Sequence, residues 1–377
     1  MPEARTILIL SFSPIATDAR VLKQVRLAGE FGEVVTCGYG PRPDGVREHI
    51  RIPDGLSVFP LAPKLLVLRL GALALRRSPA VSWAASALRG RRFDAIIADD
   101  IEALPTALHV RSTAGVLADL HEFSPGQHSN DAGWMRWVRP VLLRIVRRSL
   151  PRAAAVTTVA PIIADEYSRL SGVDVGVVIN ATPFADLRPT PVGHPLRLVH
   201  SGVCLRNRRL ELLIEAVALS GRAVELDLFL MPNDPGHLQE LRDLAEAVPG
   251  VRVREPVPYG ELVERLNDYD LGVFVLPPTT RNYEWALPNK LFDFVQARLG
   301  VLIGPTPQMA HYVEAHRLGV VTDDFTAESL ARVISTVTDE EVAAFKQAAH
   351  AAAQELSAEV AVDGWRTRLA RMLEGTR

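Results

Sequence analysis

The sequence predicts an α/β protein of two doubly wound domains, because short apolar runs alternate with helical segments twice along the chain. Its 377 residues are enough for two domains of ordinary size. A segment with four prolines, residues 180–195, separates the two sets of elements and is typical of a linker. We therefore expect a first domain over residues 1–183 and a second over residues 184–355.

Five apolar runs in the first domain predict buried strands, at residues 7–12, 34–37, 95–98, 115–120 and 155–159. Apolar residues recur at helical spacing between several of these runs, over residues 19–31 and 104–110. Strands without polar alternation are typical of parallel sheets that are covered on both faces. Ligands of such sheets bind outside the carboxyl ends of the strands, so the loops after residues 12, 98 and 120 are candidate binding loops.

The pattern starts again in the second domain, with strands predicted at residues 196–202, 224–231, 251–256, 271–276 and 300–304. Helices are predicted between them, at residues 210–220, 237–247 and 259–269. By the same rule the candidate binding loops follow residues 202, 256 and 278. The tail, residues 355–377, has the pattern of an amphipathic helix.

Composition excludes several classes of protein. The net charge of -2 does not suggest a nucleic-acid partner. Two cysteines cannot make a disulfide framework or a Cys-rich zinc site, and they suit a cytoplasmic location. The longest apolar stretch, residues 65–75, is too short to span a bilayer and contains Arg69. The first residues lead straight into a strand, so we expect no signal peptide.

Charge is unevenly distributed between the two halves. Residues 1–183 hold 22 Lys and Arg against 17 Asp and Glu, whereas the remainder holds 20 against 27. This asymmetry favours an anionic partner for the first half, although ordinary scatter explains it equally well.

The segment "NYEWALPNKLFDF" follows a predicted strand of the second domain and has the pattern of an anion site. Pro288 suits the first position of a helix, which would leave the amides of Asn289, Lys290 and Leu291 without acceptors inside the helix. An anion there gains from these donors, from the helix dipole and from the charge of Lys290. Asp293, one turn further on, suits the hydroxyls of a ribose. The alternative is a capped helix with a surface Lys and Asp.

Extended as "NYEWALPNKLFDFVQARLGVLIG", this stretch resembles the donor-site segment of glycosyltransferase family 4, retaining enzymes with the GT-B fold of two Rossmann-like domains. One branch of that family has a similar Asn-Tyr, then Pro-Asn-Lys, then an acidic residue. Other segments resemble the family in the same order, and together they span almost the whole chain: "TDARVLKQVRLAGEFGEVVT", "FDAIIADDIEALPTAL", "LADLHEF", "VHSGVCLRNRRLELLIEAV" and "PVPYGELVERLNDYDLGVFVLP".

The resemblance implies transfer of a sugar from a nucleotide-sugar donor to an acceptor hydroxyl, with retention of anomeric configuration. The donor would bind to the second domain and the acceptor to the first, and a C-terminal helix of about residues 356–377 would return to the first domain. The acceptor would be a glycan, a lipid-linked saccharide or a small molecule. No cofactor and no metal ion are expected. The sequence does not indicate the oligomeric state.

Residues that match the family's donor site are Gly202, Pro258, Tyr259, Asn282, Tyr283, Glu284, Pro288, Asn289, Lys290, Leu291 and Asp293. Family members often have two glutamates separated by seven residues. Here Asp293 replaces the second glutamate, and Trp285 stands in the position of the first, with Glu284 one place earlier. This departure leaves the contacts to the donor sugar open.

An arginine cluster follows the first strand of the second domain, at Arg206, Arg208 and Arg209. Arginine makes bidentate, permanently charged contacts to phosphate oxygens, so the cluster suits a diphosphate leaving group. By resemblance Arg208 is the best match to the family's catalytic cation and Arg209 the second. The alternative is a basic, solvated turn.

His121 follows a predicted strand of the first domain, and the family often has a histidine there that faces the donor sugar. We therefore expect His121 to be catalytic and Thr17, Asp100 and Glu122 to contact the acceptor. The alternatives are a structural histidine and an aspartate that caps a helix. "HEFSPGQH" lacks the spacing of a zinc-binding HExxH motif, so no zinc site is predicted.

Residues 134–150 predict a basic amphipathic helix in the first domain. Past Pro140, Arg144, Arg147 and Arg148 fall on one side and apolar residues on the other, and Trp134 and Trp137 precede the helix. This pattern suits peripheral contact with the inner face of a membrane, or a helix that simply packs its apolar side on the sheet.

Two rival functions remain open at this point. One is an epimerase of nucleotide sugars with the same architecture, and the other is a non-catalytic relative that binds a nucleotide sugar.

Overall fold

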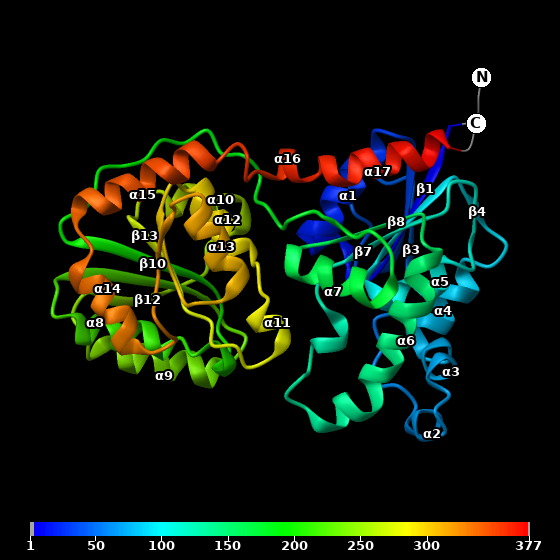
Figure 1. Ribbon diagram of the computed structural model, residues 1–377, viewed down its shortest axis with the longest axis horizontal. Coiled ribbons are helices and arrows are strands. Elements are labelled where there is room, and N and C mark those ends of the chain that lie inside the picture. Colours follow the sequence, from blue (N-terminus) through cyan, green and yellow to red (C-terminus); the bar gives the residue numbers. More distant parts are fainter. Residues whose placement is uncertain (1–3, 376–377) are drawn as a thin grey trace. The chain divides into compact units, whose positions relative to one another are not determined.

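The computed structural model describes residues 4–375, which form two compact units (Figure 1). Unit 1 extends to Ile179 and also contains Thr280–Asn282 and the segment from Val362 onward. Unit 2 consists of Asn180–Thr279 and Tyr283–Ala361. Each unit has its own parallel sheet with helices on both faces, and the C-terminal helix belongs to unit 1. The predicted fold class is confirmed.

Unit 1 is built on a seven-stranded parallel sheet with the order β3-β2-β1-β5-β7-β8-β9. Its strands are β1 (Thr6–Pro14), β2 (Glu33–Tyr39), β3 (Glu48–Arg51), β5 (Ala95–Asp99), β7 (Val116–Leu120), β8 (Ala155–Thr158) and β9 (Gly176–Val177). β4 (Arg92–Phe93) and β6 (Arg111–Ser112) form a separate pair. The strand order reverses between β1 and β5, and a doubly wound sheet binds its ligands next to that point.

The helices of unit 1 are α1 (Ala19–Gly29), α2 (Pro63–Val67), α3 (Gly71–Arg76), α4 (Pro79–Ala87), α5 (Asp100–Ala107), α6 (Arg139–Ser149), α7 (Pro161–Ser171) and α17 (Asp363–Glu374). A short 3-10 turn, Ile15–Thr17, precedes α1, and a π-helical turn, Trp134–Val138, precedes α6. α1 begins after Asp18, whose carboxylate accepts hydrogen bonds from the amides of Arg20 and Val21.

Two predicted helices have different bounds. The helix predicted at residues 104–110 begins earlier, at Asp100, directly after β5. The C-terminal helix is not continuous from residue 356, since α16 (Ala358–Ala361) ends before α17 begins at Asp363; residues 376–377 of the predicted helix lie outside the described part of the chain. α17 lies beside α1 in Figure 1, and Arg366 pairs with Glu30 at the end of α1.

Unit 2 has a six-stranded parallel sheet with the order β12-β11-β10-β13-β14-β15, the doubly wound order of nucleotide-binding sheets. Its strands are β10 (Leu196–Val203), β11 (Val224–Met231), β12 (Val251–Arg254), β13 (Leu271–Phe274), β14 (Gly300–Ile303) and β15 (Gly319–Val321). Its helices are α8 (Glu211–Ser220), α9 (Pro235–Glu246), α10 (Tyr259–Leu266), α11 (Arg281–Glu284, which begins in the loop shared with unit 1), α12 (Asn289–Gln296), α13 (Pro307–Ala315), α14 (Ala327–Thr336), α15 (Asp339–Ala352) and α16. The strand order reverses between β10 and β13.

The strands of the two large sheets that the sequence did not predict, β3, β9 and β15, all lie at sheet edges. An edge strand is only partly covered, so its sequence need not form the apolar run by which the central strands were found. The predicted linker has neither helix nor strand between Val177 and Leu196. None of the helices within residues 4–375 has the length and hydropathy needed to cross a bilayer.

Candidate functional site

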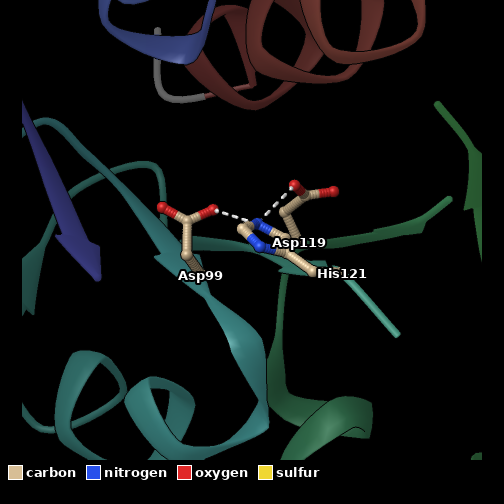
Figure 2. A group of neighbouring side chains, drawn as sticks. All are labelled: Asp99, Asp119 and His121. Atoms are coloured by element: carbon tan, nitrogen blue, oxygen red, sulfur yellow. Dashed lines mark hydrogen bonds and ion pairs between the residues drawn. The ribbon is translucent and has the colours of Figure 1, made fainter. Parts of the chain in front are cut away.

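A buried group of charged residues lies at the carboxyl ends of β5 and β7 in unit 1. Asp99 and Asp119 are register partners on these neighbouring strands, and His121 follows β7. The Nε2 atom of His121 lies 3.3 Å from Oδ1 of Asp99 and 3.5 Å from Oδ2 of Asp119 (Figure 2). Pairing of the two strands therefore places one ring nitrogen between two carboxylates.

Asp119 is held by donors from three further elements. Arg20 of α1 makes a bidentate contact of 2.7 and 2.8 Å, and Gln24 donates at 2.8 Å. Thr157 of β8 donates at 2.6 Å and the indole of Trp365 in α17 at 3.1 Å. The carboxylate thus ties the first and last helices of unit 1 to the centre of the sheet.

This arrangement favours the charged form of His121. Burial disfavours an imidazolium, but Asp100, Asp119 and Asp99 together raise the pKa of His121 well above its usual value. Burial acts to raise the pKa of Asp119, and Arg20 and His121 outweigh this and hold that pKa well below its usual range. Burial raises the pKa of Asp99 to about 6, against the hydrogen bond from His121. At neutral pH His121 is therefore a hydrogen-bond donor rather than a base.

The same three residues are the one group within residues 4–375 whose ligand atoms, all within 4.8 Å of one another, could surround a metal ion. Both oxygens of Asp119 already accept hydrogen bonds, two of them from a guanidinium. A divalent cation would have to displace these donors and stand beside Arg20. The imidazolium of His121 fits the charges of this cluster better than a metal ion does.

The residues predicted to contact the acceptor lie at the same edge of the sheet. Asp100 has a positive φ of 65° and accepts a hydrogen bond of 2.9 Å from the amide of His121. Glu122 accepts a hydrogen bond of 2.8 Å from Asn282, which lies in the part of the loop that belongs to unit 1. Thr17 is exposed after β1, and its hydroxyl donates to the carbonyl of Pro14. α5 begins at Asp100, and the residue before it, Asp99, makes no side-chain hydrogen bond that caps this helix.

Two glutamates beside this cluster have raised pKa values. Burial, and next the charge of Asp100, raise the pKa of Glu102 to about 8 and that of Glu122 to about 7. The hydrogen bond from Asn282 to Glu122 opposes the second shift. Glu122 can therefore exchange a proton near neutral pH.

The free energy of unfolding of unit 1 is expected to fall as pH rises from about 5 to about 8. A carboxyl with a raised pKa in the folded state binds more protons there than in the unfolded state, and the contribution of His121 is lost as pH rises through its raised pKa. Both effects have the same sign, and together they should amount to at least ~2 kcal/mol. Urea unfolding followed by tryptophan fluorescence measures this, and Glu102→Gln should flatten the profile. A profile that is flat, or equally steep in the variant, would contradict the assignment.

In unit 2, Gly202 and Lys290 lie against each other at the carboxyl end of β10. Gly202 has a φ of 152°, and a Cβ atom there would stand 2.2 Å from Nζ of Lys290. That Nζ atom lies 5.4 Å from the ring centroid of Phe274, the last residue of β13. The ammonium group therefore sits at the point where the strand order of this sheet reverses, over a backbone that tolerates only glycine.

The surroundings of Lys290 are depleted of negative charge. Burial and then the charge of Arg208 lower the pKa of Lys290 to about 8, with Asp293 opposing them. His200 is buried beneath it, and burial together with Lys290 lowers the pKa of His200 to about 3. His200 is therefore neutral, and its Nδ1 atom donates to the carbonyl of Val273 over 2.9 Å. Within the described residues Lys290 has no ion-pair partner. The charges of Lys290 and of the neighbouring Arg208 therefore stand side by side without a paired carboxylate.

The three arginines of the predicted cluster have different environments. Arg206 pairs with Glu240 at 2.7 Å and Arg209, which has a φ of 52°, pairs with Glu211 at 2.5 Å. Arg208 forms no ion pair within the described residues, and its Nε atom is buried without a hydrogen-bond acceptor. Its guanidinium lies 4.6 Å from the ring centroid of Tyr283, whose hydroxyl accepts from Asn207. All three arginines therefore have defined positions, but only Arg208 has no carboxylate paired with its guanidinium.

The start of α12 differs from the prediction. Pro288 is not the first helical residue but the residue before it, with an extended ψ of 157°, and the helix begins at Asn289. The amide of Leu291 is not available to a ligand, because it donates to the carbonyl of Pro288 over 3.2 Å. The amides of Asn289 and Lys290 are left at the helix start, where the helix supplies no acceptor.

Asp293 is 3% exposed and accepts a hydrogen bond of 2.6 Å from Thr182. Tyr259, the first residue of α10 after Pro258, is half-exposed; burial and then the charge of Asp293 raise the pKa of Tyr259 to about 12. Glu284 ends α11, and Trp285 follows it. These residues lie at the same edge of the sheet as Lys290, and whether they bind a nucleotide remains a prediction.

Sequence reasoning missed Arg20, Asp119 and Trp365 in unit 1 and His200 in unit 2. Two of them carried a signal, since Asp119 and His200 are polar residues inside otherwise apolar strand runs. A buried polar group requires a partner, which such a residue predicts without identifying it. Trp365 lies far along the chain from Asp119 and had no such signal.

Gly202→Ala is expected to weaken the binding of a nucleoside diphosphate at least tenfold, because the added Cβ must displace the ammonium of Lys290 and the alanine must adopt an unfavourable φ. The matched control is Gly260→Ala at the start of α10, where a Cβ would meet no atom within 4 Å. Titration calorimetry of both variants with UDP and with GDP is the measurement. Equal affinities would remove Gly202 and Lys290 from the nucleotide site.

Comparison with known proteins matches part of the chain to one family model and the fold to several solved structures. Residues 19–181 match a family model described as "Glycosyl transferase 4-like domain". A search of curated protein sequences gave no match.

The fold is similar to that of several solved structures. HepE of Anabaena, solved in complex with UDP-glucose, is 14% identical, with a TM-score of 0.69 over 98% of this chain and 100% of that one. Trehalose 6-phosphate synthase of Burkholderia multivorans is 13% identical, with a TM-score of 0.64 over 99% of each chain. A TarM variant of S. aureus, bound to fondaparinux, alpha-GlcNAc-glycerol and UDP, is 13% identical, with a TM-score of 0.60 over 77% of this chain and 58% of that one. The chain therefore has the GT-B fold of two Rossmann-like units, and within it residues 19–181 match a glycosyl transferase 4-like domain.

Proposed function

We propose that this protein is a glycosyltransferase that moves a hexose from a UDP-sugar to an acceptor hydroxyl, with retention of configuration and without a metal ion. The observation that carries the proposal is the pair of uncompensated cations, Arg208 and Lys290, beside Gly202 at the reversal point of the second sheet. UDP as the nucleotide is supported by structural neighbours that were solved with UDP or UDP-glucose.

In this proposal the two cations bind the diphosphate of the donor. When the bond between the sugar and the diphosphate breaks, negative charge builds on the leaving oxygen, and a fixed guanidinium and ammonium stabilise it. A divalent cation performs the same task in other enzymes, so the cations of the chain remove the need for one. The amides of Asn289 and Lys290 add two donors from the start of α12. Pro258, Tyr259, Tyr283, Glu284 and Asp293 are proposed to surround the remainder of the nucleotide sugar.

Unit 1 is proposed to bind the acceptor through Thr17, Asp100 and Glu122. The acceptor oxygen forms the new bond on the face of the anomeric carbon from which the diphosphate leaves, which retains the configuration, and the proton of the acceptor hydroxyl must leave. Glu122, with a pKa of about 7, can take part in that proton transfer. His121 is protonated at neutral pH, so its role is to donate a hydrogen bond to a sugar hydroxyl rather than to act as the base.

The test is incubation of the purified protein with UDP-sugars and, for comparison, GDP- and ADP-sugars, with release of nucleotide diphosphate measured with and without candidate acceptors. A transferase releases UDP faster when its acceptor is present and does not require added Mg²⁺ or Mn²⁺. Epimerase activity would instead convert the nucleotide sugar without any acceptor. Binding of UDP without turnover of any donor would indicate a non-catalytic relative. Either of the last two outcomes would refute the proposal.

A further inference from the structure

Unit 1 contains a groove of about 810 Å³ that is remote from His121. α5 begins at Asp100, at the carboxyl end of β5, and the groove is lined by its opposite end and by His109 and Val110 beyond it. Residues along α3, α4 and α6 complete the lining. Because α5 runs back along the sheet from the carboxyl end of β5, its far end lies toward the amino-terminal ends of the strands, whereas His121 lies at their carboxyl ends.

The rim of this groove is strongly basic. Its lining contains no Asp or Glu and has seven arginines: Arg76, Arg89, Arg91, Arg111, Arg144, Arg148 and Arg152. Arg91 pairs with Glu48, but none of the other six forms an ion pair within residues 4–375. Six uncompensated guanidinium groups around one groove create a strongly positive potential.

The floor of the groove is apolar, formed by Leu75, Val81, Leu88, Val141 and Ile145. No Phe, Tyr or Trp lines it, so it offers no platform on which the bases of a nucleic acid could stack. An apolar floor beneath a cationic rim matches the chemistry of a phospholipid, which carries an anionic headgroup on hydrocarbon chains.

An exposed apolar turn adjoins the groove. Val67, Leu68 and Leu70, between α2 and α3, are 61%, 66% and 46% exposed. The next residue, Gly71, packs against Val141 of α6, since a Cβ there would stand 2.4 Å from a methyl group of Val141. Three large apolar side chains at a turn, next to unpaired arginines, are unusual on a surface that faces only water.

The sequence suggested a membrane-facing role for Trp134 and Trp137, and this role remains a prediction. Trp134 is only partly exposed, because its ring packs 5.3 Å from that of Phe59 and 4.5 Å from that of His128. The predicted basic side of α6 is confirmed, since Arg144, Arg147 and Arg148 are exposed while Val141, Leu142 and Ile145 are buried. The large apolar side chains that are most exposed beside this groove are those of residues 67, 68 and 70, within the apolar stretch of residues 65–75.

We propose that this face of unit 1, the arginine groove and the turn at residues 67–70, docks the protein on a bilayer that contains anionic phospholipid. The turn inserts its apolar side chains among the headgroups, and the arginines bind phosphates around it. Each cation near such a surface strengthens binding about fivefold, so the interaction is reversible and depends on salt. The surface uses no residue of the proposed donor or acceptor sites, so it stands or fails independently of the proposed function.

The test is co-sedimentation of the full-length protein with vesicles of phosphatidylcholine alone, or of phosphatidylcholine with phosphatidylglycerol, at low and at high salt. The protein should pellet with the anionic vesicles at low salt and at least fivefold less in the other conditions. Arg144→Ala/Arg148→Ala should reduce binding at least tenfold. The control with the same net charge is Arg26→Ala/Arg317→Ala, whose exposed arginines lie outside the groove and should not matter.

A second pair of variants tests the apolar turn. Leu68→Ser/Leu70→Ser should reduce binding to anionic vesicles severalfold, whereas Leu219→Ser/Leu244→Ser, at exposed leucines of unit 2, should not. Circular dichroism and the melting temperature establish that each variant is folded. The proposal is overturned if the protein does not pellet with anionic vesicles at low salt, or if each variant binds as its control does. Binding that requires the arginines but ignores the leucines would also overturn it, since that result describes a soluble-anion site.

Discussion

Replacement of Arg208 by alanine is expected to slow sugar transfer about 10²–10³-fold, the usual effect of removing one group that stabilises charge in a transition state. The structure gives the reason for choosing this arginine. The Nε atom of Arg208 is buried without a hydrogen-bond acceptor, and the charge of Arg208 lowers the pKa of the neighbouring Lys290. A bound anion would satisfy the Nε donor and reduce the repulsion between the two cations. The loss should appear mainly in kcat, because charge on the diphosphate increases as the bond to the sugar breaks.

Arg209→Ala and Arg206→Ala are the matched controls, because these arginines come from the same turn but pair with Glu211 and Glu240. We expect a milder loss for Arg209→Ala and almost none for Arg206→Ala. The measurement is steady-state kinetics with the donor identified in the nucleotide-sugar panel. If Arg208→Ala retains the kcat of the unmodified protein, Arg208 does not stabilise the charge that builds on the departing diphosphate, and this part of the proposal is wrong.

Replacement of Asp119 by alanine is expected to lower the free energy of unfolding of unit 1 by about 3–5 kcal/mol, because it removes the carboxylate that balances the buried charge of Arg20. Both side chains are buried, with exposed fractions of 6% and 0%. The carboxylate also accepts from Thr157 and Trp365, so the loss should loosen the contact between α17 and the sheet. Urea unfolding measures the first effect, and the fluorescence of Trp365 reports the second.

Glu33→Ala is the control for this prediction. Glu33 pairs with Arg47 in the same unit, but both side chains are about half exposed, and such a pair contributes no more than about 1 kcal/mol. Asp119→Asn keeps the volume and some of the hydrogen bonds, so its effect should lie between those of the two alanine variants. A loss below about 1 kcal/mol for Asp119→Ala would show that Arg20 finds another partner.

The sequence by itself determined the class of fold and predicted the loops in which a site is proposed. The central strands of both sheets are continuous apolar runs, and a run of that kind is readable without any contact being known. Ligands of a doubly wound sheet bind outside the carboxyl ends of its strands, and the sequence predicted that His121, Arg208 and Lys290 lie there. The exact start of α12 was not readable in the same way, because Pro288 was predicted to begin the helix and instead precedes it.

Only the tertiary structure decided which of these groups is charged and which is free. The sequence has three arginines in one turn, and it does not reveal that Arg206 pairs with Glu240 of α9 whereas Arg208 forms no ion pair within the described residues. The pKa of His121 is raised by Asp100, Asp119 and Asp99, and the last two, far from each other in the chain, meet as register partners. Leu68 belongs to an apolar stretch that would suit a core, yet it is 66% exposed. Charge state and exposure depend on distant residues, and a sequence pattern reports only near ones.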